Sequence, residues 1–567
     1  MKTMSFFQVS LTVICVMSMM MVPASCTKDN DDSPVTGPIE YGKTFSYTFE
    51  GNTLYYVIDS LSQSATLVAP LYPDYPKDEI LRIDGWQGYE QPKGNVTIPE
   101  SVEYGGKRFP VTAIGEGAFS LCSDITSVTL PEGITTIGAS AFDTCTGLTT
   151  VNLPGSLTSI EKWAFADCKS MSAIELPESL TAIGPNCFNG NESLTAVTIP
   201  SRIKTICIAA FVNCTSLATV NLPEGLTTIE DYAFSYCYSL SEINLPEGLT
   251  TIGDFAFDQC KSLSAIILPE KLTIMGDHCF TGAELITTVT VPGSIQSFGE
   301  GVFMDCTGLT TAILNEKLTT IGTFMFANCT NLTTVNLPEG ITTISYAAFN
   351  RCSNLKGITF PSTLTTIEDW AFQYAEKIGP DIVIPEGVTS IGRAAFGDCY
   401  SMESITLPST LQTVGEFALA ACTILNNVTF PDHLTHLAST ALQGCTSLTN
   451  CHLPAQMEYI DDWLFTNSGI THIDIPEHVT RIGEGAFQKC MSLHELSLPA
   501  SVAELADSVF TLGTSLESLT LDSPVPPTVT ETTFETYTTA ITVPSGTGNA
   551  YRSHEIWGRF AIITEEE

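Results

Sequence analysis

The chain has 567 residues, of which 44% are hydrophobic and 15% charged, so it has enough apolar sequence to bury a core. Asp and Glu number 62 against 23 Lys and Arg, which gives a formal net charge of -39 at pH 7. Because this field repels phosphate groups, the composition argues against nucleic acid as a ligand and favours cations or basic protein surfaces.

The first 26 residues are predicted to be a signal peptide of the lipoprotein type. Lys2 precedes an apolar stretch over residues 6–22, and Cys26 follows Ala24 in a segment that resembles a bacterial lipobox. Cys26 is therefore the predicted lipid anchor. Pro23 stands where lipoboxes usually have Leu, which leaves ordinary cleavage after Ala24 as the alternative.

Residues 27–40 are predicted to be an acidic tether. They are similar to the short acidic stretch that sends some Gram-negative lipoproteins to the outer face of the outer membrane. We therefore expect lipid anchoring on the extracellular face of a bacterial outer membrane, with secretion as the alternative. No later stretch is long and apolar enough to span a bilayer, so contact with the membrane is expected through the lipid alone.

Residues 41–110 are predicted to form a β-rich N-terminal cap. Their alternating segments, such as Phe45–Phe49, Leu54–Ile58 and Val96–Pro99, are typical of strands. A cap of this kind covers the first open edge of a repeat array.

Residues 111–523 repeat with a period of 23. The repeated column consists of Phe119, Phe142, Phe165, Phe188, Phe211, Phe234, Phe257, Phe280, Phe303, Phe326, Phe349, Phe372, Phe396, Leu419, Leu442, Phe465, Phe487 and Phe510. Every step is 23 residues apart from one of 24 and one of 22. A repeat of such regular length predicts a solenoid of about 18 units rather than several globular domains.

The unit Leu217–Cys237 shows how the repeat is expected to fold. Leu217–Leu222 has the alternation of one short strand, which Pro223 ends because proline cannot donate to a ladder. Equivalent strands then form a parallel sheet with about 4.8 Å between units, roughly 90 Å in all. Residues 524–567 are expected to be a degenerate repeat and cap that closes the other edge.

Thirteen of the 19 cysteines form a column of their own, three residues after the column Phe or Leu. Disulfides of small secreted domains join dissimilar positions, whereas these cysteines are one position repeated. We interpret them as buried thiols that pack as small hydrophobes. Two units without this cysteine, which have Asn191 and Ala283 there, carry Cys187 and Cys279 just before the Phe.

The pattern L-x-x-V-x-L-P-x-x-L-x-x-I-x-x-x-A-F-x-x-C, as in Leu148–Cys168, resembles the BspA-like class of leucine-rich repeats over about residues 111–522. The resemblance implies a right-handed stack with a parallel β-sheet. It also implies a bacterial cell-surface protein, with adhesion to host or matrix proteins, or to other cells, in some members. The chain departs from the pattern at Leu419, at Leu442 and over Tyr374–Ile384.

Two sets of outward residues are candidates for ligand binding. The first is a broad uncharged strand face, exemplified by Thr219, Asn221 and Asn244, for which Asn ladders and strand preference are the structural alternative. The second lies two residues before the Phe column, where aromatics pack on neighbouring units or stack on sugars and protein anchors. Its members are Trp163, Tyr232, Phe255, Phe324, Trp370, Phe417 and Trp463.

Two sets of residues are weak candidates for metal binding. His452 and Asp474 occupy one outward column in adjacent units, with His472 and Glu495 in the next, although solvated side chains are the ordinary interpretation. A row of glutamates follows the strands and suits a solvated edge or weak calcium bridging. The row comprises Glu132, Glu178, Glu224, Glu247, Glu270, Glu316, Glu339 and Glu386.

The sequence shows no P-loop, G-x-S-x-G or H-E-x-x-H pattern, so we expect neither an enzyme nor a cofactor. A surface adhesin that presents an extended repeat face to protein or glycan partners is the leading hypothesis. The alternatives are a glycan-capturing lipoprotein of a polysaccharide uptake system and a structural component of the cell surface.

Overall fold

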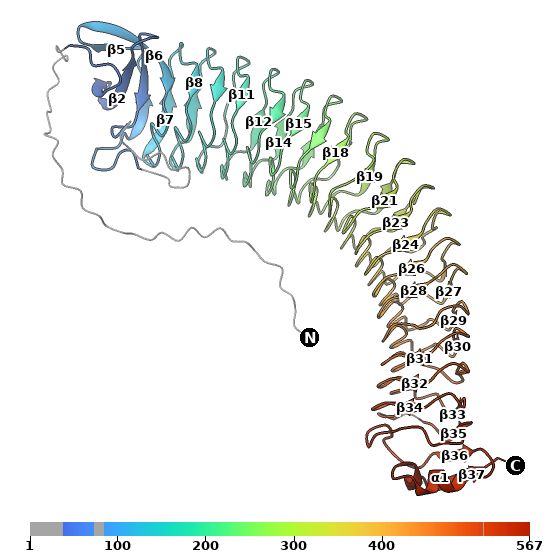
Figure 1. Ribbon diagram of the computed structural model, residues 1–567. Coiled ribbons are helices and arrows are strands. Elements are labelled where there is room, and N and C mark those ends of the chain that lie inside the picture. The colour runs from blue at the N-terminus through green and yellow to red at the C-terminus, as the bar shows by residue number, and fades with distance from the viewer. Residues whose placement is uncertain (1–37, 73–83, 514, 567) are drawn as a thin grey trace.

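The computed structural model describes residues 38–72, 84–513 and 515–566, which form one long arched stack of coils (Figure 1). A β-rich region lies at the N-terminal end and a short helix at the C-terminal end. The predicted signal peptide, Cys26 and nearly all of the tether lie outside the described residues.

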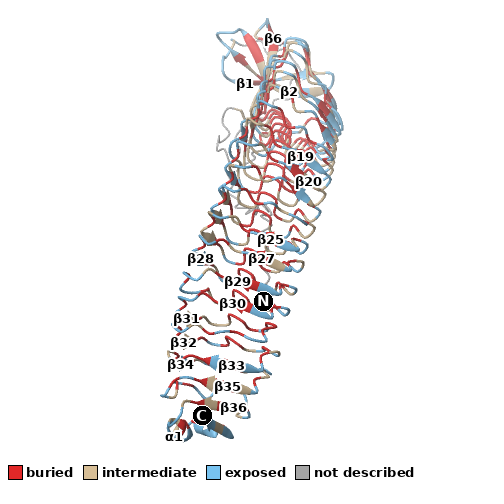
Figure 2. Ribbon diagram, turned by 90° about the vertical axis from the view of Figure 1, so that its right-hand side faces the viewer, coloured by how far each residue is buried: buried red, intermediate tan, exposed pale blue. Residues whose placement is uncertain are grey.

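Most coils contribute two short strands, where the sequence predicted one. The first is the predicted L-x-x-V-x-L strand, and the second is a Thr-Ile or similar dipeptide about nine residues later, such as Thr228–Ile229. Within each sheet of the stack, strands pair in parallel with the equivalent strands of the next coil, for example Val197 with Val220 and Ile206 with Ile229, and the two ladders are divided into several sheets along the stack. Figure 2 shows the two sets on different sides of the stack, with β31 (Tyr459–Ile460) on one side and β33 (Glu495–Leu498) on the other.

The first strand set comprises β4 (Gly94–Thr97), β7 (Ile125–Thr129), β9 (Thr150–Asn152), β12 (Ala196–Thr198), β14 (Thr219–Asn221), β16 (Glu242–Ile243), β19 (Thr288–Thr290), β20 (Thr311–Ile313), β22 (Thr334–Val335), β25 (Asp381–Val383), β27 (Ser404–Thr406), β29 (Asn427–Thr429), β30 (Asn450–His452), β33, β35 (Ser518–Leu521), β36 (Ala540–Val543) and β37 (Ile562–Glu565). We call its outer side the first-strand face.

The second strand set comprises β8 (Thr136–Ile137), β10 (Ser159–Ile160), β11 (Ala182–Ile183), β13 (Thr205–Ile206), β15 (Thr228–Ile229), β17 (Thr251–Ile252), β18 (Ile274–Met275), β21 (Thr320–Ile321), β23 (Thr343–Ile344), β24 (Thr366–Ile367), β26 (Ser390–Ile391), β28 (Thr413–Val414), β31, β32 (Arg481–Ile482) and β34 (Glu504–Leu505). We call its outer side the second-strand face.

Both ends continue the sheets of the stack. At the N-terminus, β1 (Thr44–Phe49), β2 (Asn52–Asp59) and β3 (Ser64–Val68) pair antiparallel, and β3 joins β6 (Lys107–Ile114), which also pairs with β5 (Ser101–Tyr104) and β8. At the C-terminus, β36 and β37 extend the first-strand sheet, with α1 (Gly548–Ser553) and the 3₁₀ helix η1 (Trp557–Arg559) between them.

A third ladder of backbone hydrogen bonds closes each coil beside the Phe column. The amides of Tyr232, Phe234 and Tyr236 donate to carbonyls of the following coil at 2.8 Å. Amides next to the second strands, such as that of Thr227, donate instead to the preceding coil. Tyr232 and Tyr236 have φ of 58° and 59°, so the chain makes a left-handed turn on each side of Phe234. Backbone groups that a turn would leave unpaired are thereby satisfied.

The column phenylalanines form a continuous stack along the core. From Phe119 to Phe396, neighbouring ring centroids lie 5.0 to 5.9 Å apart, with interplanar angles of 2° to 17°. Leu419 and Leu442 interrupt it, and it resumes from Phe465 to Phe534, which extends the predicted column by one member. Ring stacking adds to the burial that each coil gains from its neighbours.

The cysteine column is made of free thiols, as predicted, and the thiols also donate hydrogen bonds. Cys237 Sγ lies 3.2 Å from the carbonyl oxygen of Phe211, the column residue of the preceding coil. Eleven further cysteines make the same contact at 3.1 to 3.5 Å. Burial raises the pKa of Cys237 well above its usual value, so it remains a protonated donor.

In one coil, the residue that replaces the column cysteine is destabilising. Asn191 occupies the cysteine position, is fully buried, and neither its Nδ2 nor its Oδ1 has a hydrogen-bond partner. A buried amide without partners costs about 1–3 kcal/mol. Asn191 is therefore a local weak point of the stack.

Replacing Asn191 with Cys is expected to raise the free energy of unfolding by about 1–3 kcal/mol, because the thiol removes the unpaired amide and can donate to the carbonyl of Phe165. Urea unfolding followed by circular dichroism measures the change. The matched control is Cys214→Asn, which places the same defect in the next coil and should lower stability. A lower unfolding midpoint for Asn191→Cys than for the natural protein would contradict this account.

Candidate functional site

The predicted residues of the first-strand face are exposed, as the alternation of the strands requires. Thr219 and Asn221 flank the buried Val220, and Asn244 follows the buried Ile243 one coil later. Part of the face serves stacking, since Asn221 Nδ2 donates to Thr198 Oγ1 at 3.1 Å. The structure therefore places the predicted residues on one open, polar surface, which also carries the exposed carboxylate of Glu242.

Three aliphatic side chains interrupt this polar surface, and the sequence analysis did not single them out. Ile267, Val383 and Ile313 occupy the column of Asn221 and Asn244, with exposed fractions of 81%, 62% and 46%. The sequence itself distinguishes these three positions, because each has an aliphatic residue where most other units have Asn or Thr. Ile267 and Ile313 lie two coils apart, roughly 10 Å, on the first-strand face.

The predicted aromatic stripe is half-buried, and one pair of its members stacks ring on ring. Tyr232 and Phe255 are parallel at 5.0 Å, and Phe255 continues onto His278 at 5.0 Å. Tyr232 is 42% exposed, whereas Trp163, Phe255, Phe324, Trp370 and Trp463 are of intermediate exposure. All six have positive φ, so they stand on the left-handed turn of the third ladder. Packing between coils therefore buries part of each of these aromatic side chains and leaves the rest accessible to a ligand.

Several members of the glutamate row link successive coils. Glu178 accepts hydrogen bonds from the amide of Ser201 at 3.1 Å and from its hydroxyl at 2.7 Å, which lowers the pKa of that carboxyl. Glu339 and Glu386 bind Ser362 and Ser409 in the same way. Within the described ranges, no group of three or more His, Cys, Asp or Glu side chains is arranged to hold a metal ion.

The histidine candidates pair with nearby carboxylates. His472 Nε2 lies 3.1 Å from Asp474 of its own coil, and His452 Nε2 lies 3.2 Å from Asp432 rather than from Asp474. Glu495 lines the same shallow surface hollow as His472 and Asp474. These contacts are solvent-exposed pairs.

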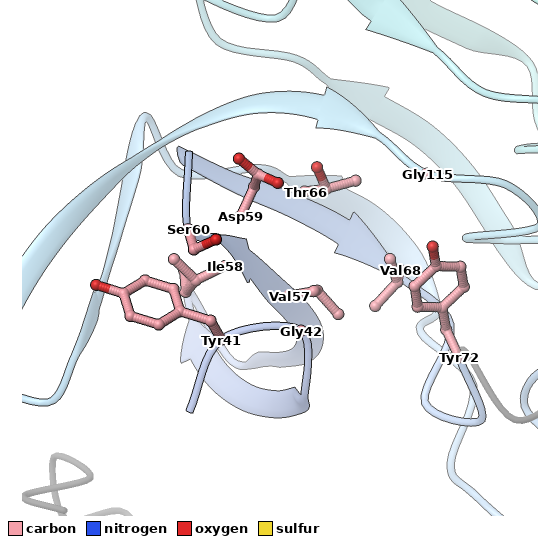
Figure 3. A pocket seen from close by; sticks show the side chains of 10 residues that line it. All are labelled: Tyr41, Gly42, Val57, Ile58, Asp59, Ser60, Thr66, Val68, Tyr72 and Gly115. Atoms are coloured by element: carbon pink, nitrogen blue, oxygen red, sulfur yellow. The ribbon is translucent and has the colours of Figure 1, made fainter. Parts of the chain in front are cut away.

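Two further hollows on the described surface are of interest. In the N-terminal region, a hollow of about 360 Å³ has Tyr41 and Tyr72 on opposite sides and Val57 on its floor (Figure 3). Its carboxylate, Asp59, already accepts the amides of Leu61 and Ser62. A groove of about 460 Å³ crosses β24, β26 and β28 on the second-strand face, and it is lined by Tyr346 and Arg393, which the sequence analysis did not name.

The repeat pattern matches a known family over most of the chain. The model described as the BspA type leucine-rich repeat region matches in six overlapping copies, over residues 112–241, 182–310, 227–356, 273–394, 379–490 and 460–549. The chain belongs to the BspA-type leucine-rich repeat family. This confirms the predicted family and the solenoid fold.

Several solved structures that resemble this BspA-type protein are bacterial leucine-rich repeat proteins. One from Bacteroides ovatus is 25% identical, covering 80% of this chain and 95% of that chain, with a TM-score of 0.49. A leucine-rich cell surface protein of Faecalibacterium prausnitzii is 26% identical, covering 64% and 94%, with a TM-score of 0.41. A search of curated proteins found no match. Among the described residues of this BspA-type protein, no helix is long and apolar enough to cross a membrane.

One carboxyl of this BspA-type protein is buried beside the exposed tyrosines. Asp258 is 7% exposed and lies 3.4 Å from the hydroxyl of Ser235 in the preceding coil. Burial raises the pKa of Asp258 to about 6, against partial compensation by hydrogen bonds from Gln259 and Ser235. The folded state therefore holds this proton more tightly than the unfolded state. Protonated Asp258 therefore stabilises the folded state fully at low pH, and this contribution is lost as the pH rises through about 6.

Asp258→Asn is expected to stabilise the protein by about 3 kcal/mol at pH 8 and by about half as much at pH 5, since one pKa unit corresponds to about 1.4 kcal/mol. Urea unfolding at the two pH values measures both gains. Glu247→Gln, at an exposed carboxylate, is the control for the change in net charge and should show little effect. An equal gain from Asp258→Asn at both pH values would show that the buried carboxyl is not the cause.

Proposed function

We propose that this protein is a non-enzymatic surface protein that binds other macromolecules through its first-strand face. The observation that carries the proposal is a long open surface, mostly of Thr and Asn side chains, that is interrupted by exposed aliphatic side chains at Ile267 and Ile313. Binding energy at protein interfaces concentrates in a few such apolar anchors surrounded by polar contacts that exclude water. Thr288 and Thr290 supply that polar surround between the two isoleucines.

The fold supports this use of the surface. The inward residues of neighbouring coils form the core. The outward residues do not pack in that core, so they are available to a partner. The acidic net charge of -39 favours partners with basic surfaces. Host proteins, matrix proteins and proteins of neighbouring cells are the proposed partner classes, following the resemblance that the repeats show.

The proposed location is the extracellular face of a bacterial outer membrane, with a lipid on Cys26 as the sole membrane contact. The apolar stretch over residues 6–22 and the acidic residues that follow Cys26 support it. Capture of glycans for a polysaccharide uptake system is the second candidate function. The groove between Tyr346 and Arg393 favours that candidate.

The test of protein binding is the double variant Ile267→Asn, Ile313→Asn of the chain from residue 27 onward. Asn is the residue of neighbouring units at this position, so the fold should be preserved while the anchors are lost. Binding is measured on an array of host and matrix proteins and then by titration against each hit. We expect a loss of 10-fold or more in affinity, since each apolar anchor contributes about 1–2 kcal/mol or more.

The matched control is Ile274→Thr, because Ile274 is 53% exposed on the second-strand face and Thr is the usual residue there. This variant should bind as the natural protein does. Equal losses in the control and the double variant, or no loss in either, would contradict the assignment of the binding surface.

A further inference from the structure

The groove on the second-strand face is distinct from the proposed protein-binding surface. It runs across the parallel strands β24, β26 and β28, roughly 10 Å from the first to the last. Its volume of about 460 Å³ lies in the range of ligand pockets, about 300–1,000 Å³. Thr366, Ser390 and Thr413 line it with hydroxyl groups above the buried Ile367 and Ile391.

The polar groups at the groove are held in place by neighbouring coils. Asp369 Oδ1 accepts the amide of Arg393 at 2.7 Å, and Glu368 Oε2 accepts the amide of Tyr346 at 2.8 Å. Gly392 permits this approach, since a Cβ there would lie 2.5 Å from Asp369. These bonds fix the backbone from which the side chains of Tyr346 and Arg393 project.

The side chain of Arg393 is also oriented before any ligand arrives. Its guanidinium carbon lies 5.6 Å from the centroid of the Phe417 ring, and its Nε lies 3.6 Å from Glu416. A guanidinium presents five donors in a planar fork, more than these contacts can occupy. Arg393 therefore retains donors for a ligand in the groove.

The aromatic ring of Tyr346 lines the groove and is supported by two further rings outside it. Tyr346 lies 5.0 Å from Trp370 and 5.2 Å from Phe324, measured between ring centroids. Burial raises the pKa of the Tyr346 hydroxyl, with a further increase from Asp369, so the hydroxyl remains a proton donor at neutral pH. No other unit carries an aromatic residue at the position of Tyr346, three residues before the Phe column, so the ring is particular to this groove.

We propose that this groove binds a short segment of a neutral carbohydrate chain. Sugars present apolar C–H faces that pack on aromatic rings and rows of hydroxyls that both donate and accept hydrogen bonds. The groove offers both kinds of partner: the ring of Tyr346, the donors of Arg393, and the carboxylates of Glu368 and Asp369. Its extent over three strands suits an oligosaccharide rather than a single sugar.

The charges at the groove argue against other ligand classes. The carboxylates of Glu368, Asp369 and Glu416 outnumber the guanidinium of Arg393, so a phosphate or sulfate ligand would be repelled. A basic peptide would meet Arg393 at the groove itself. A neutral ligand that uses donors and acceptors together avoids both penalties.

The test uses the chain from residue 27 onward, an array of neutral and sulfated oligosaccharides, and native gels containing starch, mannan, xylan or β-glucan. We expect retardation by at least one of these polysaccharides that is little changed between 0.05 and 0.5 M NaCl, as a neutral ligand requires (about 3-fold change at most). Tyr346→Thr and Arg393→Thr should each weaken binding about 10-fold or more, and Tyr346→Phe should retain most of it by keeping the ring.

Ile208→Thr is the matched control, because Ile208 occupies the same repeat position as Tyr346 in another coil and is 45% exposed. It should bind as the natural protein does. The proposal is overturned if the array shows no binding and no gel shows retardation. It is also overturned if Tyr346→Thr and Arg393→Thr leave binding intact, or if binding is confined to sulfated glycans. The Ile267→Asn, Ile313→Asn variant should retain carbohydrate binding, so failure of the protein-binding proposal is measured separately.

Discussion

The structure depends on one constraint: no coil can bury its own apolar side chains, so each must be covered by the coils on either side. The stacked phenylalanines make this visible, since nearly every ring from Phe119 to Phe396 lies between two others. The three backbone ladders and the thiol contacts to Phe carbonyls run between coils as well. Stability is therefore a sum of nearest-neighbour terms, and a defect such as Asn191 weakens two interfaces without disturbing the rest.

This arrangement separates folding from recognition. Inward positions are mostly Leu, Ile, Val, Phe, Ala, Met and Cys, whereas outward positions can change without consequence for the core. The two strand sets give the protein two outer faces, one with Ile267 and Ile313 and one with the groove at Tyr346. A single stack can thus present different chemistry to different partners, which suits a protein on a cell surface.

The sequence was sufficient for the fold because the spacing of the Phe column encodes the stack directly. The same periodicity predicted that Asn221 points outward and that the column cysteines are buried and form no disulfides. The second strand was missed because a dipeptide such as Thr228–Ile229 is too short to show a strand period. The groove was missed because Tyr346, Arg393 and Phe417 come from three different coils.

The most direct test of the stacking account is the length of the deletion that the solenoid tolerates. Deleting residues 217–239 removes one whole coil and joins equivalent positions, whereas deleting residues 217–228 joins positions that point to different faces. Small-angle X-ray scattering and circular dichroism compare the two with the natural protein. The account predicts that the whole-coil deletion stays folded and shortens by about 4.8 Å along the stack, while the half-coil deletion loses cooperative unfolding. Equal tolerance of both deletions, or loss of folding from the whole-coil deletion, would contradict it.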